Sequence, residues 1–211
     1  MTFTIREATR AGRANKPNTR DFAMKKHLPK LPPNFVDPIT GYAPTNEVQM
    51  SGLLGLLHQM GSVKWEKVPL LLPNNELSGK MANELLARTM MCGEYQLFWN
   101  SDQEMRVWGA MPADLICFSE GNQTVAIIEN KIGSSFTGVR NDPAVSQLAK
   151  QLDFLLGCKF STRALILLST TELFNRGLYR NELASALNHA KRDKNVTGYL
   201  MRWEDVLVAV D

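Results

Sequence analysis

An α/β fold, in which helices flank a mixed β-sheet, is the class that this sequence predicts. Short β-branched apolar runs alternate with longer segments whose apolar residues recur at helical spacing. Along the chain they follow the order helix, three strands, helix and strand (αβββαβ), which suits helices packed on a sheet. With 44% hydrophobic residues among 211, the chain can bury one core, so one domain with extensions is expected.

The first predicted element is a basic, proline-rich arm over residues 1–44, ahead of a domain at 45–211. Residues 1–33 contain eight basic and two acidic side chains, a charge of +6, whereas the whole chain carries +3. Because the arm lacks sustained periodicity, we expect it to be extended and to wrap the domain or a partner. It either binds nucleic-acid phosphates or serves as a solubilising tail. A transit peptide is a third alternative, although the amphipathic pattern is poor.

Four segments have the apolar spacing of helices. The first contains Gly52 and Gly55, which we interpret as positions of close packing because no P-loop Lys-Ser/Thr accompanies them. Pro143, at the start of the third, is acceptable in a first helical turn. The predicted helices are Asn46–Met60, Leu77–Met91, Pro143–Leu156 and Leu178–Lys191.

Short apolar runs predict the strands. Leu115–Phe118 and Thr124–Ile128 flank the polar break Ser119–Asn122 and predict a β-hairpin. Both faces of the hairpin are apolar, so we expect it in mid-sheet, covered on both sides. The polar segment Gly133–Asn141 is a predicted loop. The other predicted strands are Val68–Leu72, Glu94–Trp99, Met105–Trp108, Ala164–Leu168 and Tyr199–Trp203, with Val206–Val210 a strand or a short helix.

Charged residues stand at the outer ends of this hairpin. Asp114 precedes its first run, while Glu129 and Lys131 close the second and share one face because side chains alternate along a strand. A turn of even length places Asp114 on that face. With Gly121-Asn122 at the centre of the turn, Asp114 lies directly opposite Glu129. With Glu120-Gly121 at the centre, it lies diagonal to Glu129. An odd length sends it to the other face. The cluster is either a surface group in which Lys131 neutralises two acids, or a catalytic site.

At these residues the sequence resembles the PD-(D/E)XK nuclease superfamily. The motif is Pro112-Ala113-Asp114 followed by Glu129-Asn130-Lys131, with one residue between Pro and Asp where the name-giving pattern has none. The resemblance extends to a following helix that bears Gln147, and it covers about residues 76–170. Related nucleases often carry Gln-x-x-x-Tyr on this helix, whereas this chain has Gln151 in place of the tyrosine.

The resemblance implies a restriction-endonuclease-like core and metal-dependent hydrolysis of phosphodiester bonds in nucleic acid, with DNA the expected substrate and a 5′-phosphate on the product. Asp114, Glu129 and the carbonyl oxygen of Asn130 would bind Mg²⁺, for which Mn²⁺ can substitute. Lys131 would orient or help deprotonate a water and offset negative charge. Gln147 would orient the substrate or the lysine.

One further metal ligand is expected from a helix that precedes the first core strand, as the resemblance implies. Glu84 on the second predicted helix is the candidate for this role, and Glu47 on the first is the alternative. Either residue can instead be an ordinary solvated helix acid.

Other classes remain open beside the enzyme. The chain could be a non-catalytic nucleic-acid-binding or assembly subunit that keeps the fold, or a nuclease-like partner in restriction or phage defence. A homodimer or a partner subunit is compatible with either. Three dispersed cysteines and three scattered histidines offer no metal-binding spacing, which favours reduced thiols and a cytoplasmic protein. No apolar stretch is long enough to span a membrane, so no membrane partner is expected.

Overall fold

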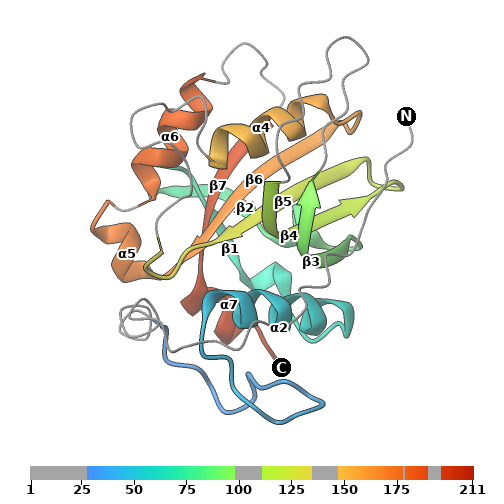
Figure 1. The fold of residues 1–211 in the computed structure, drawn as a ribbon, viewed down its shortest axis with the longest axis vertical. Helices are drawn as coiled ribbons and strands as arrows, with labels where there is room; N and C mark the ends of the chain where they lie inside the picture. The colour runs from blue at the N-terminus through green and yellow to red at the C-terminus, as the bar shows by residue number, and fades with distance from the viewer. Residues whose placement is uncertain (1–27, 98–110, 135–146, 178, 190–195) are drawn as a thin grey trace.

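Seven strands form one mixed sheet in the computed structural model, which describes residues 28–97, 111–134, 147–177, 179–189 and 196–211 (Figure 1). The spatial order is β2-β1-β7-β6-β5-β4-β3. Strands β5, β6 and β7 run parallel, and every other neighbouring pair is antiparallel. The α/β class and the mixed sheet are therefore confirmed. The strands are β1 (Pro69–Leu71), β2 (Leu77–Met81), β3 (Met90–Leu97), β4 (Met111–Ser119), β5 (Thr124–Asn130), β6 (Thr162–Ser169) and β7 (Val196–Arg202).

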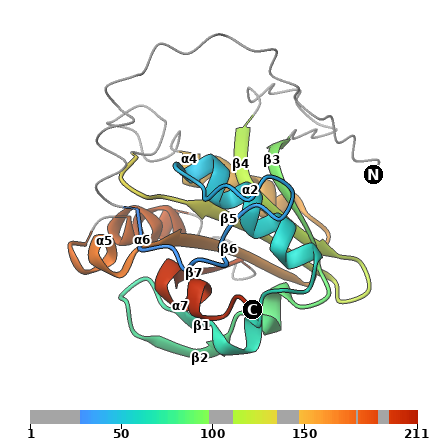
Figure 2. The same ribbon diagram turned by 90° about the horizontal axis from the view of Figure 1, so that it is seen from below.

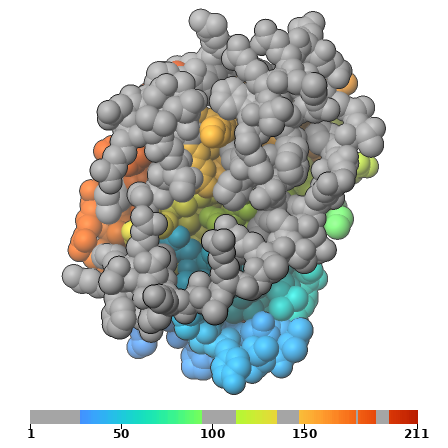
Figure 3. Space-filling view, viewed as in Figure 1, coloured from blue at the N-terminus to red at the C-terminus, as the bar shows by residue number. Residues whose placement is uncertain are grey.

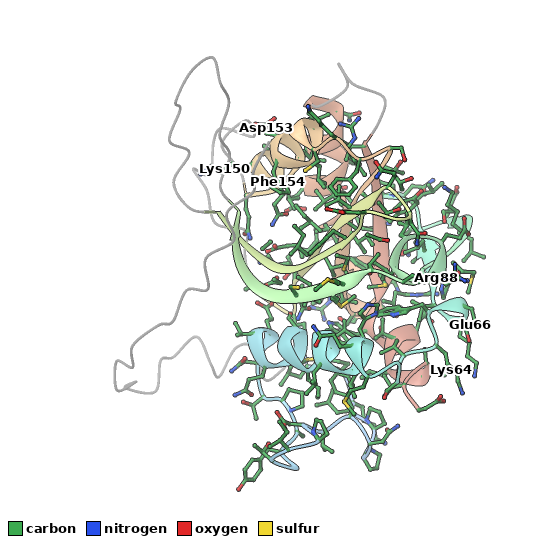
Figure 4. All side chains as sticks on the ribbon, turned by 90° about the vertical axis from the view of Figure 1, so that its right-hand side faces the viewer. Lys64, Glu66, Arg88, Lys150, Asp153 and Phe154 are labelled. Carbon is green, nitrogen blue, oxygen red and sulfur yellow. The ribbon has the colours of Figure 1, made fainter. Side chains whose placement is uncertain are left out.

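Helices cover both faces of the sheet, and each face has its own apolar core. One core joins the sheet to α2, α3 and α7, and the other joins it to α4, α5 and α6. Figure 4 shows α2 and α4 on opposite sides of the strands, and Figure 2 shows α2 lying across the half of the sheet that holds β3 and β4. The helices are α2 (Glu47–Gln59), α3 (Asn83–Leu86), α4 (Gln147–Gly157), α5 (Thr171–Asn175), α6 (Arg180–His189) and α7 (Trp203–Val208), with a 3₁₀ turn at Trp65–Lys67.

The predicted hairpin is the antiparallel pair β4–β5. Leu115 pairs with Ile128 and Ser119 with Thr124, so four residues separate the last pair and Gly121-Asn122 is the centre of the turn. Its side chains divide between the two cores: Leu115 and Ile128 lie in the α2 core, while Ile116 and Ile127 lie in the α4 core. Of the turn lengths that the sequence left open, the structure has the even one, centred on Gly121-Asn122. The expected burial of both faces of the hairpin is confirmed.

Helix α2 begins and packs as its sequence predicts. The side chain of Asn46 accepts the Gln49 N–H (2.9 Å), and Oε1 of Gln49 accepts the Thr45 N–H (2.8 Å), so the first turn is capped from both directions. A Cβ atom added at Gly55 would lie 3.3 Å from Cδ2 of Leu115. This short distance confirms that Gly55 allows close packing of α2 on β4.

The segment Leu77–Met91 was expected to be one helix, and this prediction was wrong. It forms the edge strand β2, the one-turn helix α3 and the start of β3. Gly79 (φ +78°) and Arg88 (φ +61°) have left-handed backbone conformations, which a continuous right-handed helix cannot contain. Leu77, the first residue of the expected helix, is 69% exposed on the edge strand.

The other predicted elements are found with small changes at their ends. Residues 147–157 of the helix expected at 143–156 are described and helical, and the strand expected at 164–168 is the longer β6. The last segment is a short helix, α7, followed by an isolated bridge between Val63 and Val210. Met105–Trp108, Pro143 and residues 135–141 of the expected loop lie outside the described residues, as do residues 1–27 of the arm.

The described part of the arm, residues 28–44, has no regular structure and packs on the domain. Phe35 is fully buried, and its ring meets that of Trp203 edge-on with 5.9 Å between centroids. Leu28 and Leu31 pack against the same core. At least this part of the arm therefore wraps the domain.

Three further observations concern the cysteines, His58 and the length of the helices. Cys92, Cys117 and Cys158 are free thiols. Nδ1 of His58 accepts the indole N–H of Trp65 (2.8 Å), and its Nε2 lies 2.8 Å from the carbonyl oxygen of Thr89, which makes His58 a structural histidine. Among the helices of the described residues, none has the length and apolar character needed to cross a membrane.

Candidate functional site

Four elements meet at the carboxyl end of β5. The amino-terminal part of β4 lies beside it in the sheet, the first turn of α2 lies on one face, and the first turns of α4 lie on the other. Figure 3 shows parts of α4 (orange), of the β4–β5 region (yellow-green) and of α2 (blue-green) close together on one face of the molecule. This end of the hairpin carries Asp114, Glu129 and Lys131.

Glu129 and Lys131 form a buried ion pair. Nζ of Lys131 lies 2.6 Å from Oε1 of Glu129, with the two side chains 9% and 0% exposed. Burial alone would lower the pKa of Lys131, but the carboxylates of Glu129 and Asp114 outweigh burial and raise it above its usual value. Lys131 is therefore a cation throughout the neutral range.

Asp114 stands beside this pair. Extending the hairpin register by one residue places it opposite Glu129, and its Oδ2 accepts the N–H of Asn130 (2.8 Å). Burial and the charge of Glu129 raise the pKa of Asp114 to about 7, against the opposing effect of Lys131. Burial likewise raises the pKa of Glu129. Both carboxyl groups therefore hold protons more tightly than acids in water do.

Two glutamines of α4 hold the carboxylate of Glu129. Nε2 of Gln147 donates to Oε1 and Nε2 of Gln151 donates to Oε2, each at 2.6 Å. Both glutamines are buried, whereas Asp153 on the same helix is exposed (Figure 4). Gln147, expected to orient the substrate or the lysine, contacts the carboxylate oxygen that Lys131 also contacts. Gln151 was noted in the sequence only as a departure from a motif.

Glu47, the alternative to Glu84, lies at the site. Its Oε1 accepts the N–H of Ile132 and the hydroxyl of Ser134 (2.9 Å for the latter), so it holds the segment that follows Lys131. Its charge raises the pKa of both Asp114 and Glu129. Glu47 is the first residue of α2, where the helix dipole favours a negative charge.

Glu84 is placed differently. Its side chain is exposed, and its Oε1 accepts the N–H of Met81 at the start of α3 (3.0 Å). It is not among the charges that perturb Asp114, Glu129 or Lys131. In this structure Glu84 is a local cap, and the arrangement favours Glu47 as the third acid of the site.

Asn130 faces the opposite side of the sheet and links three elements there. Its Nδ2 donates to the carbonyl oxygen of Glu47 and to Oγ of Ser51, both at 3.0 Å, and its Oδ1 accepts the indole N–H of Trp203 (2.8 Å). The side chain is fully buried. The side chain of Asn130 therefore anchors the site strand to α2 and α7, and only its backbone carbonyl is a possible metal ligand.

Tyr179 and Ser169 fix the backbone that follows Glu129. The hydroxyl of Tyr179 accepts the N–H of Gly133 (3.1 Å) and donates to the carbonyl oxygen of Ser134 (2.9 Å). Oγ of Ser169, at the end of β6, donates to the carbonyl oxygen of Lys131. Neither residue was singled out in the sequence, since both are distant from the motif along the chain.

The residues present fit a magnesium ion. Carboxylate and carbonyl oxygens are the ligands that Mg²⁺ prefers, and it is held by one or two carboxylates with several waters. Glu47, Asp114 and Glu129 are three acids near the ammonium of Lys131. Burial first, and then the charge of Glu129, raise the pKa of Asp114. Among the described residues, no group of three or more His, Cys, Asp or Glu side chains is arranged so that it could hold a metal ion.

Comparisons with protein-family models, with curated proteins and with solved structures give no match for this chain.

Proposed function

We propose that this chain is a metal-dependent nuclease of the PD-(D/E)XK type, with a restriction-endonuclease-like core, that hydrolyses phosphodiester bonds in DNA. The observation that carries the proposal is the meeting of Asp114, Glu129 and Lys131 at the end of one buried hairpin. The order of the acids and the lysine along the chain is that of the motif. The mixed sheet, with α2 and α4 on its two faces, is compatible with that core.

The carboxylates of Asp114 and Glu129 and the carbonyl oxygen of Asn130 would hold the ion. A bound Mg²⁺ would lower the pKa of a water and neutralise charge on the phosphate oxygens. Glu47 would add negative charge at the ion from the first turn of α2. Holding buried acids close together costs free energy because their charges repel each other. A bound cation would offset this repulsion, which supports metal binding here.

Lys131 would act as a fixed positive charge. Since its pKa is raised by Glu129 and Asp114, it keeps its protons at neutral pH and is poorly suited to accept one from water. An ammonium held in a buried site stabilises negative charge that develops on a phosphate far better than one in solvent. We therefore assign to it charge stabilisation and orientation of the water, not proton abstraction.

The test is a cleavage assay with Mg²⁺ or Mn²⁺ on supercoiled, linear and single-stranded DNA and on RNA. We expect the wild type to cut DNA and to lose activity in EDTA. Lys131→Ala should reduce the rate by about a hundredfold or more, as loss of one buried stabilising donor does elsewhere, while Glu84→Gln should cut normally.

Failure to cut any of these substrates with either metal would overturn the enzyme proposal. DNA binding that persists in such a protein, and that Lys131→Ala weakens only slightly, would instead support the non-catalytic nucleic-acid-binding subunit.

A further inference from the structure

We propose that Gln151 is a positioning residue of the metal site: its Nε2 fixes Glu129, and its Oε1 receives a hydrogen bond from a water held at the ion. This inference rests on the proposed function and extends it to a residue outside the motif. It also gives a role to the position where related nucleases carry a tyrosine.

The first step is the hydrogen bonding of Glu129. Its carboxylate offers about four lone pairs. Oε1 takes two donors, Nζ of Lys131 and Nε2 of Gln147, whereas Oε2 takes only Nε2 of Gln151. Oε2 therefore keeps a lone pair among the described residues, and it is the oxygen available to a cation.

The second step is the carbonyl oxygen of Gln151 itself. Gln151 is 0% exposed, and its Oε1 has no hydrogen-bond partner in the described structure. The amide cannot turn over to satisfy this atom, because Oε1 would then face the carboxylate oxygen of Glu129 at the 2.6 Å now spanned by Nε2. An unsatisfied buried acceptor costs about 1–3 kcal/mol, so a donor is needed here.

The third step joins the two atoms. Oε1 belongs to the same amide as the Nε2 that touches Oε2 of Glu129, so the unfilled acceptor and the available carboxylate oxygen are close together. Mg²⁺ retains several waters when two carboxylates hold it, and such waters are strong donors. A water of the hydration shell would satisfy Oε1 of Gln151 while the ion takes Oε2 of Glu129.

The experiment compares three methionine variants of the full chain, since Met keeps the length of Gln without its amide. Gln151→Met removes both contacts, Gln147→Met removes a donor from the oxygen that Lys131 also holds, and Gln59→Met removes a hydrogen bond to Met91 on another part of the sheet. Calorimetry gives the Kd of Mn²⁺ and Mg²⁺ without nucleic acid, and thermal melting in EDTA gives stability.

We expect Gln151→Met to raise the metal Kd by about 10- to 100-fold, as loss of an outer hydrogen-bond partner does at other metal sites. Gln147→Met should change it less, and Gln59→Met not at all. At saturating metal, Gln151→Met should lower kcat and leave KM for DNA near the wild-type value. Should Gln151→Met not fold, Gln151→Asn, which withdraws the same amide by one methylene, gives the same readings.

Wild-type metal affinity in a Gln151 variant that has only lost melting temperature would overturn the inference and leave the proposed function intact. A wild-type protein that binds neither metal would overturn the proposed function, and the inference with it.

Discussion

Asn130 and its neighbour Glu129 are both fully buried polar side chains at the end of β5. They differ in whether their hydrogen-bonding groups and charges are compensated by partners. Asn130 is neutral, and its amide nitrogen and oxygen both have partners from α2 and α7. On the opposite face, Glu129 shares one ammonium with two other acids, and the pKa of Asp114 is raised to about 7. A neutral side chain whose donors and acceptors all have partners requires no further contact. An excess of buried negative charge, by contrast, is stabilised by an additional cation.

The largest effect should come from Lys131→Met, which removes the cation paired with Glu129. Breaking a buried ion pair by deleting one partner costs about 3–5 kcal/mol, because the remaining charge is left uncompensated. We expect a loss of this size in urea unfolding at pH 8 in EDTA. Because burial raises the pKa of Glu129, the loss should be smaller at lower pH, and it should also shrink on addition of Mg²⁺.

Equal destabilisation at pH 8 and at lower pH would show that Lys131 contributes through packing and not through charge. Lys150→Met, on the outer part of α4, is the matched control and should leave stability within about 0.5 kcal/mol of the wild type.

The second effect is the pH dependence of stability. The pKa of Asp114 is about 7 in the folded state and ordinarily 3.8, so between these pH values the folded state holds a proton that the unfolded state has released. Stability should therefore fall as pH rises from about 5 to 8, by on the order of a few kcal/mol. The raised pKa of Glu129 acts in the same direction.

Asp114→Asn should flatten this dependence, and saturating Mg²⁺ should oppose it in the wild type. Urea unfolding in EDTA at several pH values measures both. A wild-type stability that rises between pH 5 and pH 8 would contradict the assignment of excess negative charge to this face.

The third effect concerns the face of the sheet on which Asn130 contacts α2 and α7. Asn130→Ala leaves the indole N–H of Trp203 without its acceptor and removes a donor from Ser51, at a cost of about 1–3 kcal/mol. Because the backbone carbonyl at 130 remains, we expect a lower melting temperature with nearly unchanged metal affinity. A large loss of metal affinity in a stably folded Asn130→Ala protein would mean that the two faces are not independent.

The smallest effect separates the two candidate acids outside the hairpin. Glu47→Gln removes a charge that acts on Asp114 and Glu129, and it should weaken metal binding by about tenfold in calorimetry. Glu84→Gln should change neither metal affinity nor, beyond about 0.5 kcal/mol, stability. Equal loss of metal affinity in both variants would place Glu84 in the site after all.

The hairpin was the most predictable part of the molecule. Its apolar runs and the common face of Glu129 and Lys131 follow from alternation along a strand, which is a local property. The turn length, which decides the face of Asp114, was left open by the sequence. The same reasoning failed at Leu77–Met91, where Gly79 and Arg88 interrupt an apolar spacing that resembles a helical stripe. Apolar spacing does not record a left-handed backbone at an ordinary residue such as Arg88.

The partners of the site were less predictable, because they come from distant parts of the chain. Glu47 reaches Ile132 across 85 residues, and Tyr179 reaches Gly133 across 46. Choosing Glu47 over Glu84 required knowing that α2 lies on this end of the hairpin. Gln151 could have been suspected, since it lies one turn from Gln147 on the same helix face.

The hydrogen bond from Trp203 to Asn130 also has a consequence for the order in which the protein is made. The two residues are 73 positions apart, so at about 5–20 residues per second the ribosome adds the indole several seconds after the site strand. Until then Oδ1 of Asn130 lacks the indole N–H as its donor, and the residues of α7 are missing from the core on this face of the sheet. The strand that carries the acidic residues therefore gains this hydrogen bond only after Trp203 has been added.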